Sequence, residues 1–277
     1  MDSDKNAELE QIELRLLLEG VFLRYGYDFR DYAPASLKRR IMTVVAAEKM
    51  DTISALLARV LHDPECMSRL LKALSINVTA MFRDPEFYRA VRKEVIPILR
   101  TFPFIRVWIA GCATGEEAYS IAILLHEEGI FDRCRIYATD MNSIVVKQAA
   151  QGIFPLTVMR DYTANYIRAG GLKSFSDWYT ANYDFALFSQ ELRSKIVFSH
   201  HNLVTDGSMN EFNLILCRNV MIYFNQTLQN RVHKLLYESL SVSGILGLGD
   251  KEIIKFSGFE DRYAVLDGTN RLYKRIG

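Results

Sequence analysis

The stretch Ile105–Ser120, IRVWIAGCATGEEAYS, decides the expected fold of this chain. Ile105–Ala110 is largely apolar and rich in β-branched and aromatic residues, which predicts a buried strand. The small residues Gly111–Gly115 predict a turn, and apolar residues at helical spacing follow from Glu116. A strand, a glycine turn and a helix open a nucleotide-binding βαβ unit, because the glycines admit a ligand and the helix N-terminus offers unpaired N–H groups. The same turn also occurs in α/β proteins for packing alone, and that alternative stays open at this point.

The composition is that of an ordinary globular chain of one large or two small domains, with 277 residues, 49% of them hydrophobic. Its 34 basic and 33 acidic residues nearly cancel, so charge gives no general drive toward nucleic acid or an anionic membrane. The four cysteines form no Cys-x-x-Cys pair and the five histidines show no metal spacing, which favours a cytoplasmic protein without a metal site. No signal peptide opens the chain, and no apolar run approaches the roughly 20 residues of a membrane span.

Residues 1–74 predict a small all-helical domain of four short helices. Asp51 is a candidate cap for the third helix, and Asp63 followed by Pro64 is a candidate cap for the fourth. The second helix carries Lys38-Arg39-Arg40, which is either a solvated face or a docking surface for an acidic partner.

Residues 75–277 predict a second, α/β domain. It begins with the linker SINVTAMFR (75–83), which is unusually apolar for an exposed loop, and a helix follows from Asp84-Pro85 to about Arg100. The predicted second strand ends at Asp140, where nucleotide-binding βαβ units place an acidic residue on the ribose hydroxyls. The spacing from Gly111 exceeds the roughly 20 residues of the dinucleotide fingerprint, and the turn is not G-x-G-x-x-G, so both features disfavour NAD.

The α/β alternation stops between about 153 and 193, where aromatic residues and short β-like runs predict an inserted β-subdomain. A long decorated crossover is an equal alternative, and the aromatic residues could recognise a partner. Strands then resume, and a hairpin joined by Asp267-Gly268 closes the chain. In an open parallel sheet, ligands lie at the carboxyl ends of the strands, and a terminal hairpin is typical of a methyltransferase architecture. The loops at those ends carry Gly111 to Glu117, Asp140, Asn202-Leu203 and Arg218-Asn219.

Five segments, in order and spacing, resemble the motifs of the CheR family: INVTAMFRD, WIAGCATGEEAYSIA, ATDMNSIVVKQA, HHNL and FNLILCRNVMIYFN. Members of that family are S-adenosylmethionine-dependent protein-glutamate methyltransferases of bacterial chemotaxis receptors. The resemblance implies a class I (Rossmann-like) methyltransferase sheet with a C-terminal hairpin, a helical N-terminal domain and an inserted β-subdomain. It also implies S-adenosyl-L-methionine as cofactor and S-adenosyl-L-homocysteine as product.

The resemblance further implies roles for individual residues. Arg83 and Tyr223 match residues beside the transferred methyl group and are the candidate catalytic pair. The candidate cofactor-binding residues are Asn77, Thr79, Arg83, Gly111, Glu117, Asp140, Asn202, Leu203, Arg218 and Asn219. The structural alternatives are an ion pair of Arg83 with Asp84 or Glu86, and a Tyr223 that only packs the strand end.

Two departures from the family pattern limit what can be carried over. Ala118 stands where the family often has proline, and Gly249-Asp250-Lys251-Glu252 stands where many members have His-Ser-Glu, so no role is assigned to those positions. Residues 153–193 do not match the form that binds a receptor tail peptide.

The leading interpretation is an active, cytoplasmic protein-glutamate O-methyltransferase, which we expect to be a monomer. Its expected partner is the cytoplasmic domain of a methyl-accepting chemoreceptor or a related sensory protein, with no nucleic acid and no direct membrane insertion. Three alternatives remain: a catalytically weak regulatory module that binds the cofactor or its product, a nucleic-acid methyltransferase, and a dinucleotide oxidoreductase. Near-neutral charge and the absence of an Asn/Asp-Pro-Pro-Tyr/Phe motif disfavour the nucleic-acid enzyme.

Overall fold

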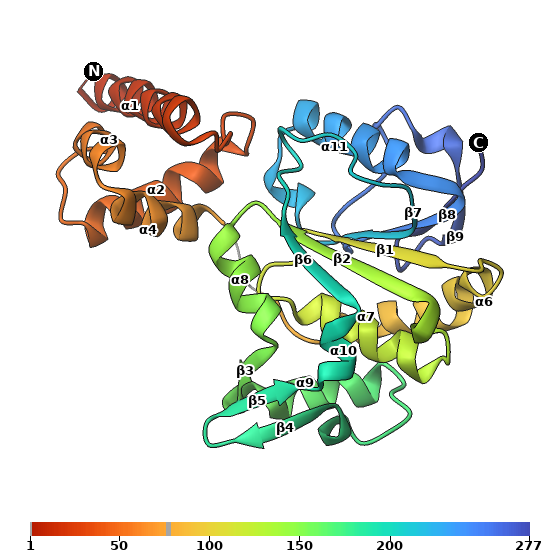
Figure 1. Cartoon of the computed structure of the whole chain (residues 1–277). Coiled ribbons are helices and arrows are strands. Elements are labelled where there is room, and N and C mark those ends of the chain that lie inside the picture. The colour runs from red at the N-terminus through yellow and green to blue at the C-terminus, as the bar shows by residue number, and fades with distance from the viewer. Residues whose placement is uncertain (1, 76–78) are drawn as a thin grey trace. The chain divides into compact units, whose positions relative to one another are not determined.

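The computed structural model describes residues 2–75 and 79–277, and contacts within the chain divide it into two compact units (Figure 1). Of the described residues, the helical unit comprises 2–75 together with 223–229, and the larger unit comprises 79–222 and 230–277. Among the described residues, no helix combines the length and the apolar character that crossing a membrane requires.

The helical unit is built from four helices, as the sequence predicts. They are α1 (Asp2–Tyr25), α2 (Pro34–Ala47), α3 (Ile53–His62) and α4 (Pro64–Leu74). Asp63 caps α4 as expected, because its carboxylate accepts hydrogen bonds from two backbone N–H groups of the first turn. The prediction that Asp51 caps α3 is wrong by one position, since the hydroxyl of Thr52 accepts the capping bond.

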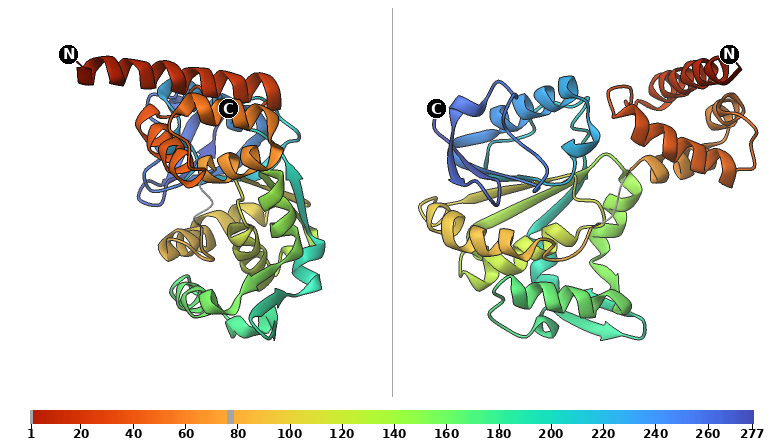
Figure 2. Two further views of the ribbon diagram at one scale, coloured as in Figure 1. Left: turned by 90° about the vertical axis from the view of Figure 1, so that its left-hand side faces the viewer. Right: turned by 180° about the vertical axis from the view of Figure 1, so that it is seen from behind.

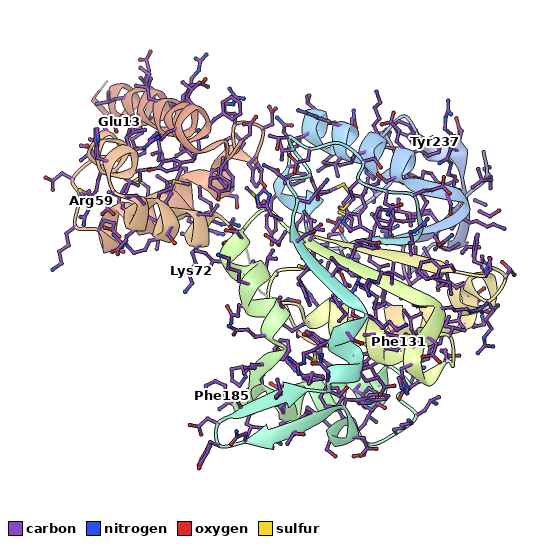
Figure 3. All side chains as sticks on the ribbon, in the orientation of Figure 1. Glu13, Arg59, Lys72, Phe131, Phe185 and Tyr237 are labelled. Atoms are coloured by element: carbon purple, nitrogen blue, oxygen red, sulfur yellow. The ribbon has the colours of Figure 1, made fainter. Side chains whose placement is uncertain are left out.

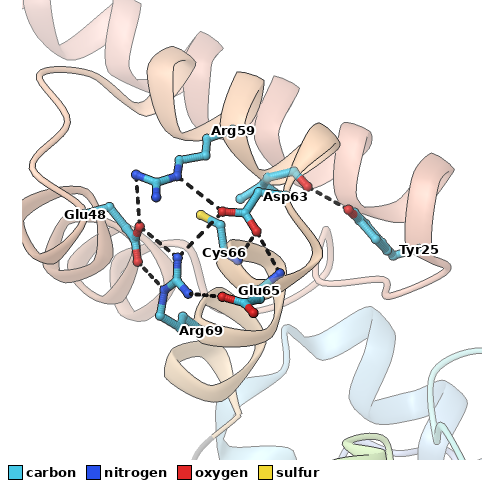
Figure 4. Close-up of polar contacts among 8 residues, drawn as sticks. Tyr25, Glu48, Arg59, Asp63, Glu65, Cys66 and Arg69 are labelled. Carbon is cyan, nitrogen blue, oxygen red and sulfur yellow. Dashed lines mark hydrogen bonds and ion pairs between the residues drawn. The ribbon is translucent and has the colours of Figure 1, made fainter.

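A cluster of ion pairs joins three of these helices (Figure 4). Arg69 of α4 and Arg59 of α3 both contact Glu48, which directly follows α2. Arg59 also contacts Asp63, the cap of α4. Both arginine side chains remain more than 40% exposed, so such pairs contribute little to stability.

Residues 223–229 pack within the helical unit, although they follow the strands of the larger unit in the chain. The N–H of Ala33 donates to the carbonyl of Tyr223 at 2.8 Å. Tyr32 and Phe224 form an antiparallel bridge, and their ring centroids lie 4.8 Å apart. The first helices and a segment about 190 positions later therefore share one packed structure.

The larger unit contains a seven-stranded sheet among its described residues, in the order β6-β2-β1-β7-β8-β10-β9. The strands are β1 (Ile105–Ala110), β2 (Cys134–Asp140), β6 (Ile196–His200), β7 (Phe212–Cys217), β8 (Leu240–Leu248), β9 (Tyr263–Asp267) and β10 (Leu272–Arg275). The first five strands in this order are parallel, and β10 is antiparallel to both of its neighbours. The predicted parallel sheet with a terminal hairpin is confirmed.

Helices cover both faces of this sheet (Figures 1 and 2). On one face lies α7 (Glu116–Glu127), and on the other lies the part of α11 (Gln226–Ser239) that belongs to this unit. Val107, Trp108 and Ile109 of β1 are each fully buried, as expected for a central parallel strand covered on both sides. The remaining short elements outside the insertion are α8 (Ser143–Gln151), η2 (Phe131–Arg133), η4 (Met221–Tyr223) and η5 (Glu260–Arg262).

The segment before β1 is helical, as predicted, but it is not a single regular helix. It comprises α5 (Pro85–Ala90), the π-helical η1 (Val91–Val95) and α6 (Ile96–Leu99). Pro97 supplies no backbone N–H, which interrupts the α-helical hydrogen-bond ladder at this point.

The insertion forms a three-stranded antiparallel sheet in the order β3-β5-β4, together with a helix that the sequence analysis did not predict. Its elements are β3 (Ile153–Pro155), α9 (Leu156–Arg168), η3 (Phe175–Trp178), β4 (Tyr179–Asn182), β5 (Phe185–Phe188) and α10 (Gln190–Ser194). Most of its aromatic side chains are buried and join the hydrophobic core of the larger unit. Tyr179 is partly buried, and Tyr183 and Phe185 are exposed, at 94% and 52% (Phe185 is labelled in Figure 3).

Candidate functional site

The candidate residues of the larger unit gather at the carboxyl edge of four neighbouring parallel strands. Gly111 follows β1, Asp140 ends β2, Asn202 comes two residues after β6, and Arg218 follows β7. These strands are adjacent in the sheet, in the order β6-β2-β1-β7. Residues up to about 100 positions apart in the sequence are therefore brought to one edge, which is where open α/β sheets bind ligands.

The turn after β1 requires glycine at its first position. Gly111 has a φ of +81°, in the left-handed region, and a Cβ atom there would lie 2.5 Å from the Cγ2 atom of Val220. The backbone N–H groups of Gly111 and Cys112 both donate to the carbonyl of Thr139 at the end of β2. The turn is therefore packed between the ends of β2 and β7, which explains its small residues.

Asp140 points toward this turn. Its Oδ2 atom accepts from the N–H of Ala113 at 3.0 Å, and its Oδ1 atom accepts from the N–H of Asn142 at 2.9 Å. Burial raises the pKa of the Asp140 carboxyl, and these backbone hydrogen bonds oppose that increase. The structure therefore holds this carboxylate beside the glycine turn.

Arg218 is the electrostatic centre of the site. Its Nη1 atom contacts Oε1 of Glu117 at 2.7 Å, and its Nη2 atom contacts Oδ2 of Asp84 at 2.8 Å. Only 3% of the Arg218 side chain is exposed, and its guanidinium lies 3.9 Å from the ring centroid of Phe87. Burial alone would lower the pKa of Arg218, but the charges around it, with Glu117 first, raise that pKa above its usual value.

The linker before α5 is held against the same site. The N–H of Phe82 donates to Oγ of Ser120 in α7 at 2.9 Å, and the amide of Asn165 in α9 donates to the carbonyl of Met81 at 3.1 Å. Phe82 has a φ of 51°, and its side chain is fully buried. The carbonyl of Arg83 lies 3.4 Å from Nη2 of Arg218. The insertion, α7 and the residue after β7 therefore all contact the linker that carries Arg83.

Asn202 and Leu203 lie in the buried part of the loop after β6, with exposures of 4% and 7%. The side-chain carbonyl of Asn202 accepts from the N–H of Val204 at 3.0 Å, which closes a tight turn. The structure thus fixes the backbone of both candidates next to the end of β2, where Asp140 lies.

Three candidates are not described as part of this edge. Thr79 is half-buried in the linker, and Asn77 lies outside the described residues. Tyr223, the last residue of η4, belongs to the helical unit, where the guanidinium of Arg40 lies 5.1 Å from the centroid of its ring.

Glu252 is a residue of this edge that the sequence analysis missed. Its carboxylate accepts hydrogen bonds from four backbone N–H groups, three of which belong to the loop that follows Arg218. Those three donors lie more than 30 positions earlier in the chain, and no local pattern links them to the segment 249–252. Asp84 was likewise expected only as an ion-pair partner for Arg83, and the structure pairs it with Arg218.

The chain is similar to known proteins over almost its whole length. The family model described as CheR methyltransferase, SAM binding domain, matches residues 77–272, and the one described as CheR methyltransferase, all-alpha domain, matches residues 12–75. A protein of Pseudomonas putida named putative methyltransferase Cher3 is 48% identical over 275 residues, covering 99% of this chain and 100% of that protein. A chemotaxis protein methyltransferase of Listeria innocua is 30% identical and covers 83% of this chain and 85% of its own. The corresponding protein of Salmonella typhimurium is 26% identical, covering 88% and 84%.

These matches agree with the observed architecture. A helical N-terminal domain precedes a parallel sheet that ends in a hairpin, and the candidate site residues gather at the carboxyl ends of the parallel strands. They also establish S-adenosylmethionine as the cofactor of the matched domain. The chain therefore belongs to the CheR family of S-adenosylmethionine-dependent methyltransferases.

Proposed function

We propose that this chain transfers a methyl group from S-adenosylmethionine to glutamate side-chain carboxylates of a chemoreceptor-type signalling protein, which yields glutamyl methyl esters. The observation that carries the proposal is the Arg218 bridge, which joins Glu117 at the start of α7 to Asp84 beside the candidate Arg83. Relatives named chemotaxis protein methyltransferase support the class of substrate.

The cofactor site that we propose lies along the carboxyl edge of the sheet. We assign Asp140 to the ribose hydroxyls and Glu117 to a second acidic contact with the cofactor. The other proposed cofactor contacts are Asn77, Thr79, Arg83, Gly111, Asn202, Leu203, Arg218 and Asn219. Apart from Asn77 and Thr79, these residues lie in loops that follow buried strands or at the end of the linker that contacts Arg218.

The proposed reaction needs no strong general base. A glutamate carboxylate, with a reference pKa of about 4.3, is already ionised at pH 7. Its oxygen attacks the methyl carbon in line as the bond from carbon to the sulfonium sulfur breaks, so S-adenosylhomocysteine leaves as a neutral thioether. Holding both groups close and aligned can supply roughly 7–11 kcal/mol of the barrier. The chain must therefore bind, align and desolvate its two substrates.

We assign the binding of the acceptor glutamate carboxylate to Arg83 and Tyr223. The forked N–H donors of Arg83 can clamp the carboxylate, and the hydroxyl of Tyr223 can orient it. The contacts proposed for the cofactor hold its adenosyl and amino-acid parts both before and after transfer. S-adenosylhomocysteine should therefore bind at least as well as S-adenosylmethionine and inhibit turnover.

The partner we propose is the cytoplasmic domain of a methyl-accepting chemoreceptor or a related sensory protein, bound by a monomer in the cytoplasm. Lys38 and Arg39 are exposed on α2, which is consistent with a docking surface for an acidic partner. Net charge near +1 gives no comparable support for nucleic acid.

The test is transfer of labelled methyl from S-adenosylmethionine to membrane fractions of the source organism. We expect base-labile label, as carboxyl methyl esters require. Arg83→Ala and Tyr223→Phe should lower turnover at least about 100-fold while S-adenosylhomocysteine affinity stays measurable, since a 1 Å misplacement alone can cost that much. Arg106→Ala, at the start of β1, and Tyr183→Phe, at the exposed insertion, are the matched controls and should keep full turnover.

Two results would contradict the proposal. Binding of S-adenosylhomocysteine by calorimetry without any base-labile transfer would favour a regulatory module instead. Binding of NAD in place of S-adenosylhomocysteine, or a salt-sensitive shift of DNA or RNA, would point to another class of protein.

A further inference from the structure

Glu252 is a buried carboxylate whose acceptor sites are filled by the backbone. Glu252 is only 3% exposed and lies in the turn that follows β8. Its own N–H donates to the carbonyl of Gly249. Its Oε2 atom accepts from the N–H groups of Gly249 at 2.7 Å and Asn219 at 2.9 Å. Its Oε1 atom accepts from Val220 at 2.8 Å and Met221 at 2.7 Å. Each carboxylate oxygen therefore binds two N–H donors, which uses the full acceptor capacity of the group.

Three of these donors are the N–H groups of residues 219–221, which follow Arg218 and lead into η4. Asn219 has a φ of 60°, in the left-handed region that asparagine adopts more readily than other non-glycine residues. Val220 packs directly over Gly111, because a Cβ atom on that glycine would lie 2.5 Å from its Cγ2. The loop is thus held between the glycine turn after β1 and the carboxylate after β8.

The position of this loop matters because proposed site residues lie in it and on both sides of it in the chain. Asn219 is itself a proposed cofactor contact, it follows Arg218, and Met221 begins η4, which ends at the proposed catalytic Tyr223. Arg218 is anchored independently by Glu117 and Asp84. The backbone after Arg218 is held by Glu252 through three N–H groups and by the packing of Val220 on Gly111.

We propose that Glu252 is a positioning residue of the methyl-transfer site, whose carboxylate sets the backbone of residues 219–221 and with it the cofactor contact of Asn219. This inference rests on the proposed function. Only a carboxylate satisfies the geometry, because both of its oxygens accept and neither donates. A glutamine would present its NH₂ group to two backbone N–H donors in either orientation, so two hydrogen bonds would be lost with the shape unchanged.

Two variants test the role. Glu252→Gln removes the charge and half of the acceptors. Gly249→Ala keeps the charge but places a Cβ atom 2.8 Å from Oε2 of Glu252 and 2.9 Å from the backbone nitrogen of Asn219, so the two groups must separate. The matched control is Glu13→Gln, another buried glutamate, which accepts from the N–H of Ser54 in the helical unit.

The experiment combines hydrogen–deuterium exchange over residues 218–224 with calorimetric titration of S-adenosylhomocysteine, on full-length variants with native circular dichroism. We expect Glu252→Gln and Gly249→Ala to speed exchange in this peptide at least about tenfold. We also expect them to weaken affinity for S-adenosylhomocysteine at least about tenfold, which corresponds to about 1.4 kcal/mol. Glu13→Gln should change neither quantity.

Each outcome decides the inference. Unchanged exchange in both variants overturns it, and so does faster exchange with affinity within twofold of wild type, because Glu252 would then be merely structural. If the wild-type chain itself does not bind S-adenosylhomocysteine, the proposed function fails, and with it the positioning role. In that case exchange over 218–224 would still report separately whether Glu252 holds the loop.

Discussion

Replacing Arg218 by methionine tests which of its two ion pairs stabilises the larger unit. The substitution removes the cation but keeps a long apolar side chain that can lie over Phe87. Glu117 is 13% exposed in its pair, whereas Asp84 is 46% exposed. The structure therefore predicts two unequal interactions around one guanidinium.

The magnitudes follow from burial. Removing one partner of a buried ion pair costs about 3–5 kcal/mol, because the remaining charge is left uncompensated, whereas exposed pairs contribute about 0.2–1 kcal/mol. We expect Arg218→Met to lower the free energy of unfolding by about 3–5 kcal/mol. Asp84→Asn should lower it by less than about 1 kcal/mol. Adding Glu117→Gln to Arg218→Met should restore part of the loss, since no buried charge then remains unpaired.

The assay is urea unfolding followed by tryptophan fluorescence. The chain has two tryptophans, Trp108 and Trp178, and both lie in the larger unit, so the signal reports that unit alone. A double-mutant cycle between Arg218 and Glu117 should give a coupling energy above about 1 kcal/mol. The reasoning is refuted if Asp84→Asn costs as much as Glu117→Gln, or if the effects at Arg218 and Glu117 are additive.

Three further predictions concern other parts of the chain. Gly111→Ala should destabilise the larger unit by more than Gly258→Ala does, since both glycines have a φ near +80° but only Gly111 would place a Cβ against a neighbour; a urea comparison that gives equal costs would contradict the packing at the turn. Burial lowers the pKa of His233 to about 4, so the unfolded chain takes up its proton at higher pH than the folded chain. Between about pH 6.5 and 4 the free energy of unfolding should therefore fall by up to about 1.4 kcal/mol per pH unit, and His233→Gln should remove that contribution in urea titrations at pH 7 and pH 5. Thr52→Ala removes the cap of α3 and should cost the helical unit about 1 kcal/mol by circular dichroism at 222 nm, with no change in tryptophan fluorescence of the larger unit.

The main strands could be predicted because their signals are local. The observed bounds of β1 and β7 coincide with the apolar runs of the sequence, and the hairpin lies on both sides of the predicted turn. Burial on both faces selects continuous apolar residues, and turn residues mark where each run ends. For the site, the same logic predicted that the residue after each parallel strand would reach one edge, because parallel strands end on the same side.

The helix α9 could not be predicted in the same way. Its sequence is rich in tyrosine and polar residues, and the aromatic residues around it suggested β-structure. In the structure, Tyr162 and Tyr166 are buried against the rest of the insertion and α7, so tertiary packing overrides a weak local preference.

The sequence alone therefore determined the α/β class, the helical domain before it and the loops that meet at the carboxyl edge, because periodicity and turn chemistry act over a few neighbouring residues. Only the tertiary structure decided that Arg218 pairs with Asp84 and Glu117, that Glu252 binds the loop 219–221, and that residues 223–229 pack with the first helices. Those contacts join residues from about 30 to 190 positions apart. Whether such groups meet depends on how the whole chain packs, and no local sequence pattern predicts these contacts.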